Sequence, residues 1–196
     1  MKNFFRERSY DAVKLLVMQC AISMFGLVLT LACGMIDNDT LRTGCSVFAI
    51  LFYLFLVYTG IWDLGAKDAV SVEYGHREYQ PLTGLWIALL ANSLNFLFAI
   101  GILLGNVLPD IELFSNIGGG SKLCSLLMQG MYTGLLAIRV GGANLNTYVF
   151  SYFLIPLPAI ITSTAAYYFG LKNKRFTRLF ELKTGKKSNK DNKNRK

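Results

Sequence analysis

The chain has 196 residues, of which 53% are hydrophobic and 16% are charged. A soluble domain of this length usually carries about 25% charged residues. The shortage of charge excludes an ordinary soluble globular domain, and the high hydrophobic content excludes a disordered chain. The composition is therefore typical of an integral membrane protein.

Four uncharged, apolar runs are each long enough to cross a bilayer. About 20 helical residues suffice, because a helix rises about 1.5 Å per residue and the hydrocarbon core is about 30 Å thick. Each run must be helical, since a lone strand would leave its backbone polar groups unpaired in lipid. The sequence therefore predicts an all-α integral membrane protein, a four-span helical bundle forming one transmembrane domain over residues 1–171. The predicted spans are residues 15–36, 43–62, 82–108 and 147–170.

A shorter apolar run, residues 123–138, lies between the third and fourth predicted spans. Its 16 uncharged residues are a length typical of buried, re-entrant or interfacial segments. Glycine clusters at 118–120 and 141–142 lie on either side of it and indicate hinges. We expect a re-entrant or interfacial hairpin here, with Arg139 meeting either an anion or the lipid headgroups.

The distribution of Lys and Arg predicts the orientation of the bundle. Basic residues near helix ends concentrate on the cytoplasmic side of membrane proteins. With four spans and both ends inside, 17 of the 20 Lys and Arg residues lie on the inner side. A fifth span, at residues 123–138, would carry the strongly basic C-terminal end outside. The sequence therefore predicts a multi-pass protein of the cytoplasmic membrane with cytoplasmic N- and C-termini.

Residues 172–196 form a basic tail that carries eleven basic and two acidic residues. Its first half is predicted to be an amphipathic helix attracted to the anionic inner leaflet of the lipid bilayer. Its second half is expected to be disordered from about residue 185. Nucleic acid is a disfavoured partner, because no aromatic residue follows Phe180 to stack on bases. The side chains expected to contact lipid headgroups are Lys174, Arg175, Arg178 and Lys183.

Polar side chains within the predicted spans are uncharged. Gln19 and Ser23 are four residues apart and share one helix face, and Asn92 and Asn95 are three apart and share another. Residues of this kind usually hold helices together, although a path for a polar solute is the alternative. Ion-coupled transporters usually place ionisable side chains within their spans, and these spans have none apart from cysteines.

Two backbone features predict local structure inside the spans. Pro156 and Pro158 each remove a backbone donor, so they are expected to kink or break the fourth span. Gly101 and Gly105 form a G-x-x-x-G pair, which predicts a close helix–helix contact in the third span.

The loop predicted at residues 63–78 holds four carboxylates and His76, the only histidine in the chain. The spacing of these carboxylates does not favour a metal site, and the histidine has no nucleophile at a recognisable distance. We therefore assign no catalytic residue, cofactor or metal. A disulfide between Cys33 and Cys45 is geometrically feasible, but buried free thiols are favoured.

Several stretches together resemble a group of uncharacterised small multi-pass membrane proteins of Gram-positive, clostridia-like bacteria. They are Trp62–Asp68 (WDLGAKD), Tyr79–Gly84 (YQPLTG), Pro156–Pro158 (PLP) and Tyr168–Gly170 (YFG). The resemblance covers about half of the chain. It implies a bacterial cytoplasmic membrane and transfers no catalytic residue.

These observations leave three functional hypotheses. The favoured one is a non-enzymatic membrane component that packs with other membrane proteins or with itself. The alternative is a small transporter or permease subunit that moves a polar solute past the break in the fourth span. The third is a membrane-embedded enzyme that uses carboxylates of the 63–78 loop.

Overall fold

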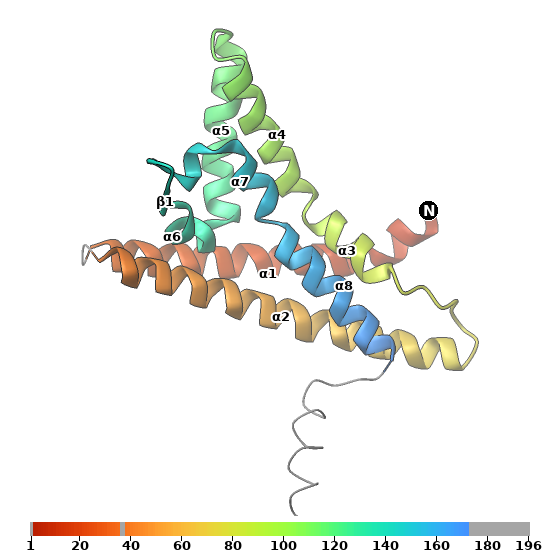
Figure 1. The fold of residues 1–196 in the computed structure, drawn as a ribbon. Helices are drawn as coiled ribbons and strands as arrows, with labels where there is room; N and C mark the ends of the chain where they lie inside the picture. The colour runs from red at the N-terminus through yellow and green to blue at the C-terminus, as the bar shows by residue number, and fades with distance from the viewer. Residues whose placement is uncertain (1, 36–37, 173–196) are drawn as a thin grey trace, which may run out of the picture.

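The computed structural model describes residues 2–35 and 38–172, which form helices joined by turns and one short two-stranded ribbon (Figure 1). Three helical segments are long and apolar enough to cross a membrane, and the bent pair α3–α4 makes a fourth if it counts as one span. The predicted helical bundle with several candidate spans is confirmed in this form. The helices are α1 (Lys2–Gly34), α2 (Asp39–Glu73), α3 (Thr83–Ala91), α4 (Ser93–Val107), α5 (Glu112–Met128), α6 (Thr133–Leu136), α7 (Val149–Leu154) and α8 (Leu157–Leu171).

Helices α1 and α2 form a long antiparallel pair (Figure 1). The 35 residues of α2 extend about 50 Å, well beyond the thickness of a hydrocarbon core. The sequence predicted a loop from residue 63 onward, and this prediction is wrong for residues 63–73, which continue α2. No proline interrupts this stretch, and its buried face continues the spacing of Val57 and Ile61 to Gly65 and Asp68.

The third predicted span is divided into two helices. Helices α3 and α4 meet at Asn92 and are bent by 49°. The Asn92 side chain donates a hydrogen bond to the carbonyl oxygen of Ala88 (2.9 Å), and the Ser93 hydroxyl donates to that of Leu90 (2.8 Å). Polar side chains that bond their own helix backbone in this way compete with the regular ladder and favour a bend.

Helices α4 and α5 pack as a hairpin that stands away from α1 and α2 (Figure 1). A Cβ atom on Gly105 would lie 2.6 Å from the Cα atom of Gly118, and one on Gly101 would collide with Ser121. The close contact predicted for Gly101 and Gly105 is therefore confirmed. The hinge predicted at residues 118–120 is wrong, because these glycines lie inside α5.

Beyond α5 the chain makes several short turns. The apolar run at residues 123–138 is not one helix, since it passes from α5 through the 3-10 turn η1 (Gly130–Tyr132) into α6. Strands β1 (Arg139–Val140) and β2 (Ala143–Asn144) then pair antiparallel, with positive φ angles of 64° and 88° at the two turn glycines. A second 3-10 turn, η2 (Leu145–Thr147), leads into α7. The helical path is interrupted again between α7 and α8, at Ile155 and Pro156.

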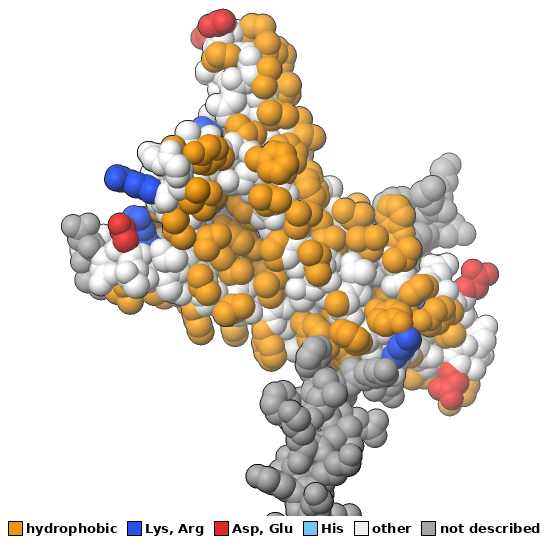
Figure 2. All heavy atoms as spheres, in the orientation of Figure 1, with side chains coloured by type: hydrophobic (Ala, Val, Ile, Leu, Met, Phe, Trp, Pro, Cys, Tyr) orange, Lys and Arg blue, Asp and Glu red, His pale blue; other side chains and the backbone are white. Residues whose placement is uncertain are grey.

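Helices α2 and α8 cross in close contact through their backbones. A Cβ atom on Gly170 would lie 2.3 Å from the carbonyl oxygen of Trp62, and one on Gly65 would lie 2.5 Å from that of Tyr167. Large apolar side chains also cover the outside of the molecule, including the visible face of the α4–α5 hairpin (Figure 2). The predicted headgroup contacts at Lys174, Arg175, Arg178 and Lys183, and the disorder expected from residue 185, lie outside the described residues.

Candidate functional site

The turn that follows α5, residues 129–132, is buried within the bundle, so the backbone groups released there need partners. Helix α1 supplies two of them. Gln19 Nε2 donates a hydrogen bond to the carbonyl oxygen of Met128 (3.2 Å), and Ser23 Oγ donates to that of Leu127 (2.7 Å). Ser23 Oγ also accepts a hydrogen bond from the backbone N–H of Gly130. The Gln19–Ser23 face predicted from sequence therefore holds the end of a neighbouring helix.

Helix α2 supports the same turn from its other side. The Ser46 hydroxyl donates a hydrogen bond to the carbonyl oxygen of Met131. Gly26 allows α1 to approach, because a Cβ atom there would lie 2.6 Å from the Cα atom of Met131. The turn at residues 129–133 is thus irregular backbone enclosed by protein, the form in which such backbone is tolerated at membrane depth.

The bend between α3 and α4 lies at the same level as the interruption before α8. Gly84 of α3 packs against Ser163 and Tyr167 of α8. Two turns further along these antiparallel helices, Asn92 and Pro156 come to the same level. Two of the three helix interruptions therefore lie at one level of the bundle.

The third interruption joins them through the α4–α5 hairpin. Gly101 lies against Ser121, and the antiparallel register then places Asn95 level with residues 127–128 at the end of α5. Asn95 Nδ2 also donates a hydrogen bond to Asn92 Oδ1 (2.9 Å). We call this region, where the chain is interrupted at residues 92, 129–133 and 155–156, the interruption centre.

Several polar atoms of the interruption centre lack a partner among the described residues. They are Gln19 Oε1, Asn95 Oδ1, Gln129 Nε2 and the Tyr132 hydroxyl, and each is shielded from solvent. The three amide side chains belong to residues that are at most 3% exposed. Burying a polar group without a hydrogen bond costs roughly 1–3 kcal/mol, so each of these atoms would be stabilised by a hydrogen bond to a water molecule or a small polar ligand.

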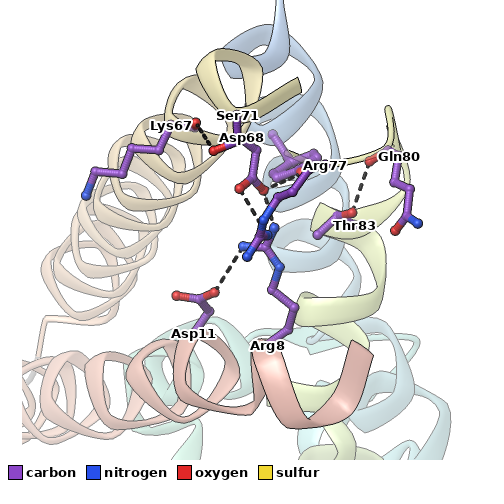
Figure 3. Close-up of polar contacts among 9 residues, drawn as sticks. Arg8, Asp11, Lys67, Asp68, Ser71, Arg77, Gln80 and Thr83 are labelled. Atoms are coloured by element: carbon purple, nitrogen blue, oxygen red, sulfur yellow. Dashed lines mark hydrogen bonds and ion pairs between the residues drawn. The ribbon is translucent and has the colours of Figure 1, made fainter. Parts of the chain in front are cut away.

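A second polar cluster lies at the end of the bundle near the N-terminus (Figure 3). Asp68 Oδ2 accepts hydrogen bonds from Arg8 and from the Tyr167 hydroxyl (2.7 Å), while Asp68 Oδ1 accepts one from Arg77 (3.2 Å). Arg8 also lies 3.4 Å from Asp11. The cluster joins α1, α2, α8 and the connection that follows α2.

The position of Asp68 corrects the sequence interpretation of residues 63–78. Asp68 was expected on a loop, whereas it is buried on α2 and ion-paired with two arginines. The Asp68 carboxylate therefore links α2 to α1 and α8 through hydrogen bonds. Among the described residues, no group of three or more His, Cys, Asp and Glu side chains is close enough to hold a metal ion.

Two further contacts concern ends of the helices. Cys33 Sγ and Cys45 Sγ lie 2.8 Å apart as free thiols where α1 and α2 meet. At the end of α8, Lys172 donates a hydrogen bond to the Tyr168 hydroxyl and lies 4.3 Å from its ring centre. This hydrogen bond raises the pKa of Lys172 above its ordinary value.

All four polar residues that the sequence selected are buried, and the interruption centre contains them together with Pro156. Pro158 lies one residue inside α8. Gln129 and Tyr132 were not predicted as site residues from the sequence. They could have been recognised as a polar side chain and a tyrosine within the short apolar run 123–138. Ser46, which is one of several hydroxyls in its span, was also missed.

Comparison with protein families, with curated proteins and with solved structures finds no match for this chain. The class of this protein is described from its fold and its site. It is an all-helical protein with three or four candidate membrane spans and an uncharged polar centre.

Proposed function

We propose that the protein is a non-enzymatic integral membrane protein that takes a small, uncharged polar solute into its bundle, as a small transporter or permease subunit does. The observation that carries this proposal is the set of unpartnered amide atoms on Gln19, Asn95 and Gln129 in the interruption centre. Discontinuous helices near the middle of a membrane are a recurring way of building solute sites.

The charges of the bundle favour an uncharged solute. The charged side chains buried among the described residues are Arg8 and Asp68, and they neutralise each other. Along α1, Arg8 lies about 16 Å from Gln19. A charged solute in the interruption centre would therefore lack a counter-charge, which is costly in a membrane interior.

The proposed location is the cytoplasmic membrane of a bacterium, with both termini on the cytoplasmic side. The support is the concentration of Lys and Arg in the N-terminal arm and the C-terminal tail. On this orientation the turn between α1 and α2 and the β1–β2 ribbon lie outside.

The orientation predicts opposite labelling of two exposed positions. Single cysteines at Asn146 and Glu78, placed in a chain without its native cysteines, are probed on intact cells with a membrane-impermeant maleimide. We expect the cysteine at Asn146 to react from outside and the one at Glu78 to react only after the cells are opened. Reaction of Glu78→Cys from outside would invert the proposed orientation.

The solute proposal predicts that the double variant Asn92→Ala, Asn95→Ala conducts poorly. Glycerol and urea serve as probes, and their entry into proteoliposomes is followed by light scattering after an osmotic shift. The wild type should admit at least one probe faster than protein-free liposomes do. The double variant should lower this added rate about tenfold, the effect of losing one or two buried hydrogen bonds.

The matched control for this experiment is Asn106→Ala, which removes an exposed amide from α4 away from the bend. Its permeation rate should equal that of the wild type. The unfolding midpoint of the double variant is measured in parallel, because loss of the bend would also lower the rate. No added permeation by the wild type, or equal loss in both variants, would overturn the proposal.

The second candidate is a component that packs with other membrane proteins, and the outer face of α5 favours it. Glu112, Ser115, Gly119 and Lys122 lie along one exposed stripe of α5. Small and polar residues on such a face are typical of helix–helix contacts in membranes. A double variant that keeps its permeation but loses a bound membrane partner would favour this function instead.

A further inference from the structure

A cavity of about 950 Å³ lies between the first turns of α2 and the segment that connects α6 to β2. Arg42 and Arg139 line it, together with Thr40, Thr43 and Asn144. It is at the α1–α2 turn, at the opposite end of the bundle from the N-terminus (Figure 1). Lys and Arg side chains are visible at this end of the molecular surface (Figure 2).

Close packing fixes the walls of this cavity. A Cβ atom on Gly134 would lie 2.5 Å from the carbonyl oxygen of Arg42, so α6 rests directly on the first turns of α2. The backbone N–H of Leu145 donates to the carbonyl oxygen of Ile138 (2.9 Å), which closes the ribbon beside it. The two arginines are therefore held on opposite walls by separate elements.

The guanidinium groups retain unused hydrogen-bond donors. Arg42 Nη2 donates to Asp39 Oδ1 (2.8 Å), but Arg42 Nε is buried and has no acceptor among the described residues. Arg139 is exposed and has no ion-pair partner among them. After Asp39 has neutralised one arginine, the cavity keeps a net positive charge.

Helix α2 adds to this positive potential. Its first residue, Asp39, lies at the cavity wall, and its N-terminal N–H groups carry the positive end of the helix dipole. The hydroxyls of Thr40 and Thr43 are further donors in the same wall. Arginines, hydroxyls and a helix N-terminus together are the groups that bind phosphate in proteins.

We propose that this cavity binds a phosphate group, carried either by an anionic lipid headgroup or by a soluble molecule. Arg139 supplies the free guanidinium and Arg42 supplies its unpartnered Nε. The site is separate from the interruption centre, so the phosphate proposal does not depend on the proposed solute function.

The test uses the full chain in dodecyl maltoside, a detergent without phosphate. Inorganic phosphate and phosphatidylglycerol are titrated separately, and the unfolding midpoint is recorded as a function of concentration. We expect at least one probe to raise the midpoint. A response to phosphatidylglycerol alone identifies a lipid headgroup, whereas a response to inorganic phosphate identifies a soluble ligand.

Variants assign any response to the cavity. Arg139→Gln should weaken the apparent affinity about tenfold or more, since a charge-assisted hydrogen bond is lost. Asp39→Asn should strengthen it, because Arg42 is released from its ion pair. Lys122→Gln removes an exposed basic residue that does not line the cavity and should leave the affinity unchanged.

Each result bears directly on the proposal. Loss in Arg139→Gln with retention in Lys122→Gln supports it. No response of the wild type to either probe, or equal weakening in these two variants, overturns it. Arg139 is exposed, so its variant should fold normally, and its midpoint without probe provides that check.

Discussion

The variant Asp68→Asn is expected to lose about 3–5 kcal/mol of folding free energy, because it removes the buried carboxylate that Arg8 contacts and leaves Arg8 only the longer contact with Asp11. The Arg8 and Asp68 side chains are 8% and 9% exposed, so water cannot replace the lost carboxylate. The Tyr167 hydroxyl would also lose a charged acceptor. The measurement is the free energy of unfolding in mixed detergent micelles, titrated with dodecyl sulfate.

The matched control for this prediction is Asp63→Asn, which removes an exposed carboxylate from the same helix. It should change the free energy of unfolding by less than about 0.5 kcal/mol. The double variant Arg8→Met, Asp68→Leu should recover much of the loss, since an apolar pair of similar volume can replace a buried ion pair. Equal effects of Asp68→Asn and Asp63→Asn would show that the cluster does not hold the helices together.

The second large effect is expected at the α2–α8 crossing. Gly170→Ala should destabilise the protein by about 1–3 kcal/mol, because the added methyl group overpacks the crossing. The obstacle is backbone, with the carbonyl oxygen of Trp62 at 2.3 Å and the N–H nitrogen of Ala66 at 3.0 Å. A flexible side chain could move aside, whereas here the helices themselves must separate. The same titration measures the effect.

Gly60→Ala provides the comparison on α2. A Cβ atom at this position meets nothing within 4 Å. Replacing glycine by alanine inside an open helix face should be neutral or stabilising by up to about 1 kcal/mol. Equal changes in the free energy of unfolding for Gly170→Ala and Gly60→Ala would contradict the close backbone contact between α2 and α8.

The lengths of the apolar runs predicted candidate spans but could not locate the ends of helices. Charged residues after Trp62 indicate where the hydrocarbon core ends, but they do not indicate where the helix ends, because a helix can continue into water. Residues 63–73 contain no proline, and Asp68 gains a buried partner only when α1 is in place. Such long-range pairing is invisible in a local pattern.

The interruption centre could be predicted in part from the sequence. The four-residue spacing of Gln19 and Ser23 was sufficient to place them on one face of a helix. Their partners could not be predicted, because the backbone at residues 127–130 needs hydrogen bonds only if α5 ends there. The bend at Asn92 was missed for a similar reason, since the run from 82 to 108 is uncharged and contains no proline between its apolar halves.

The continuity of α2 has a mechanical consequence. Arg42 at the cavity and Asp68 in the ionic cluster lie on one uninterrupted helix, about 40 Å apart along its axis. An α-helix is far stiffer than the turns around it, so a tilt of α2 at the cavity would also displace Asp68 at its other end. If the cavity bound phosphate more tightly in one tilt of α2 than in another, its occupation would change the energy of the Arg8–Asp68 pair, and that pair would change the affinity of the cavity by the same factor.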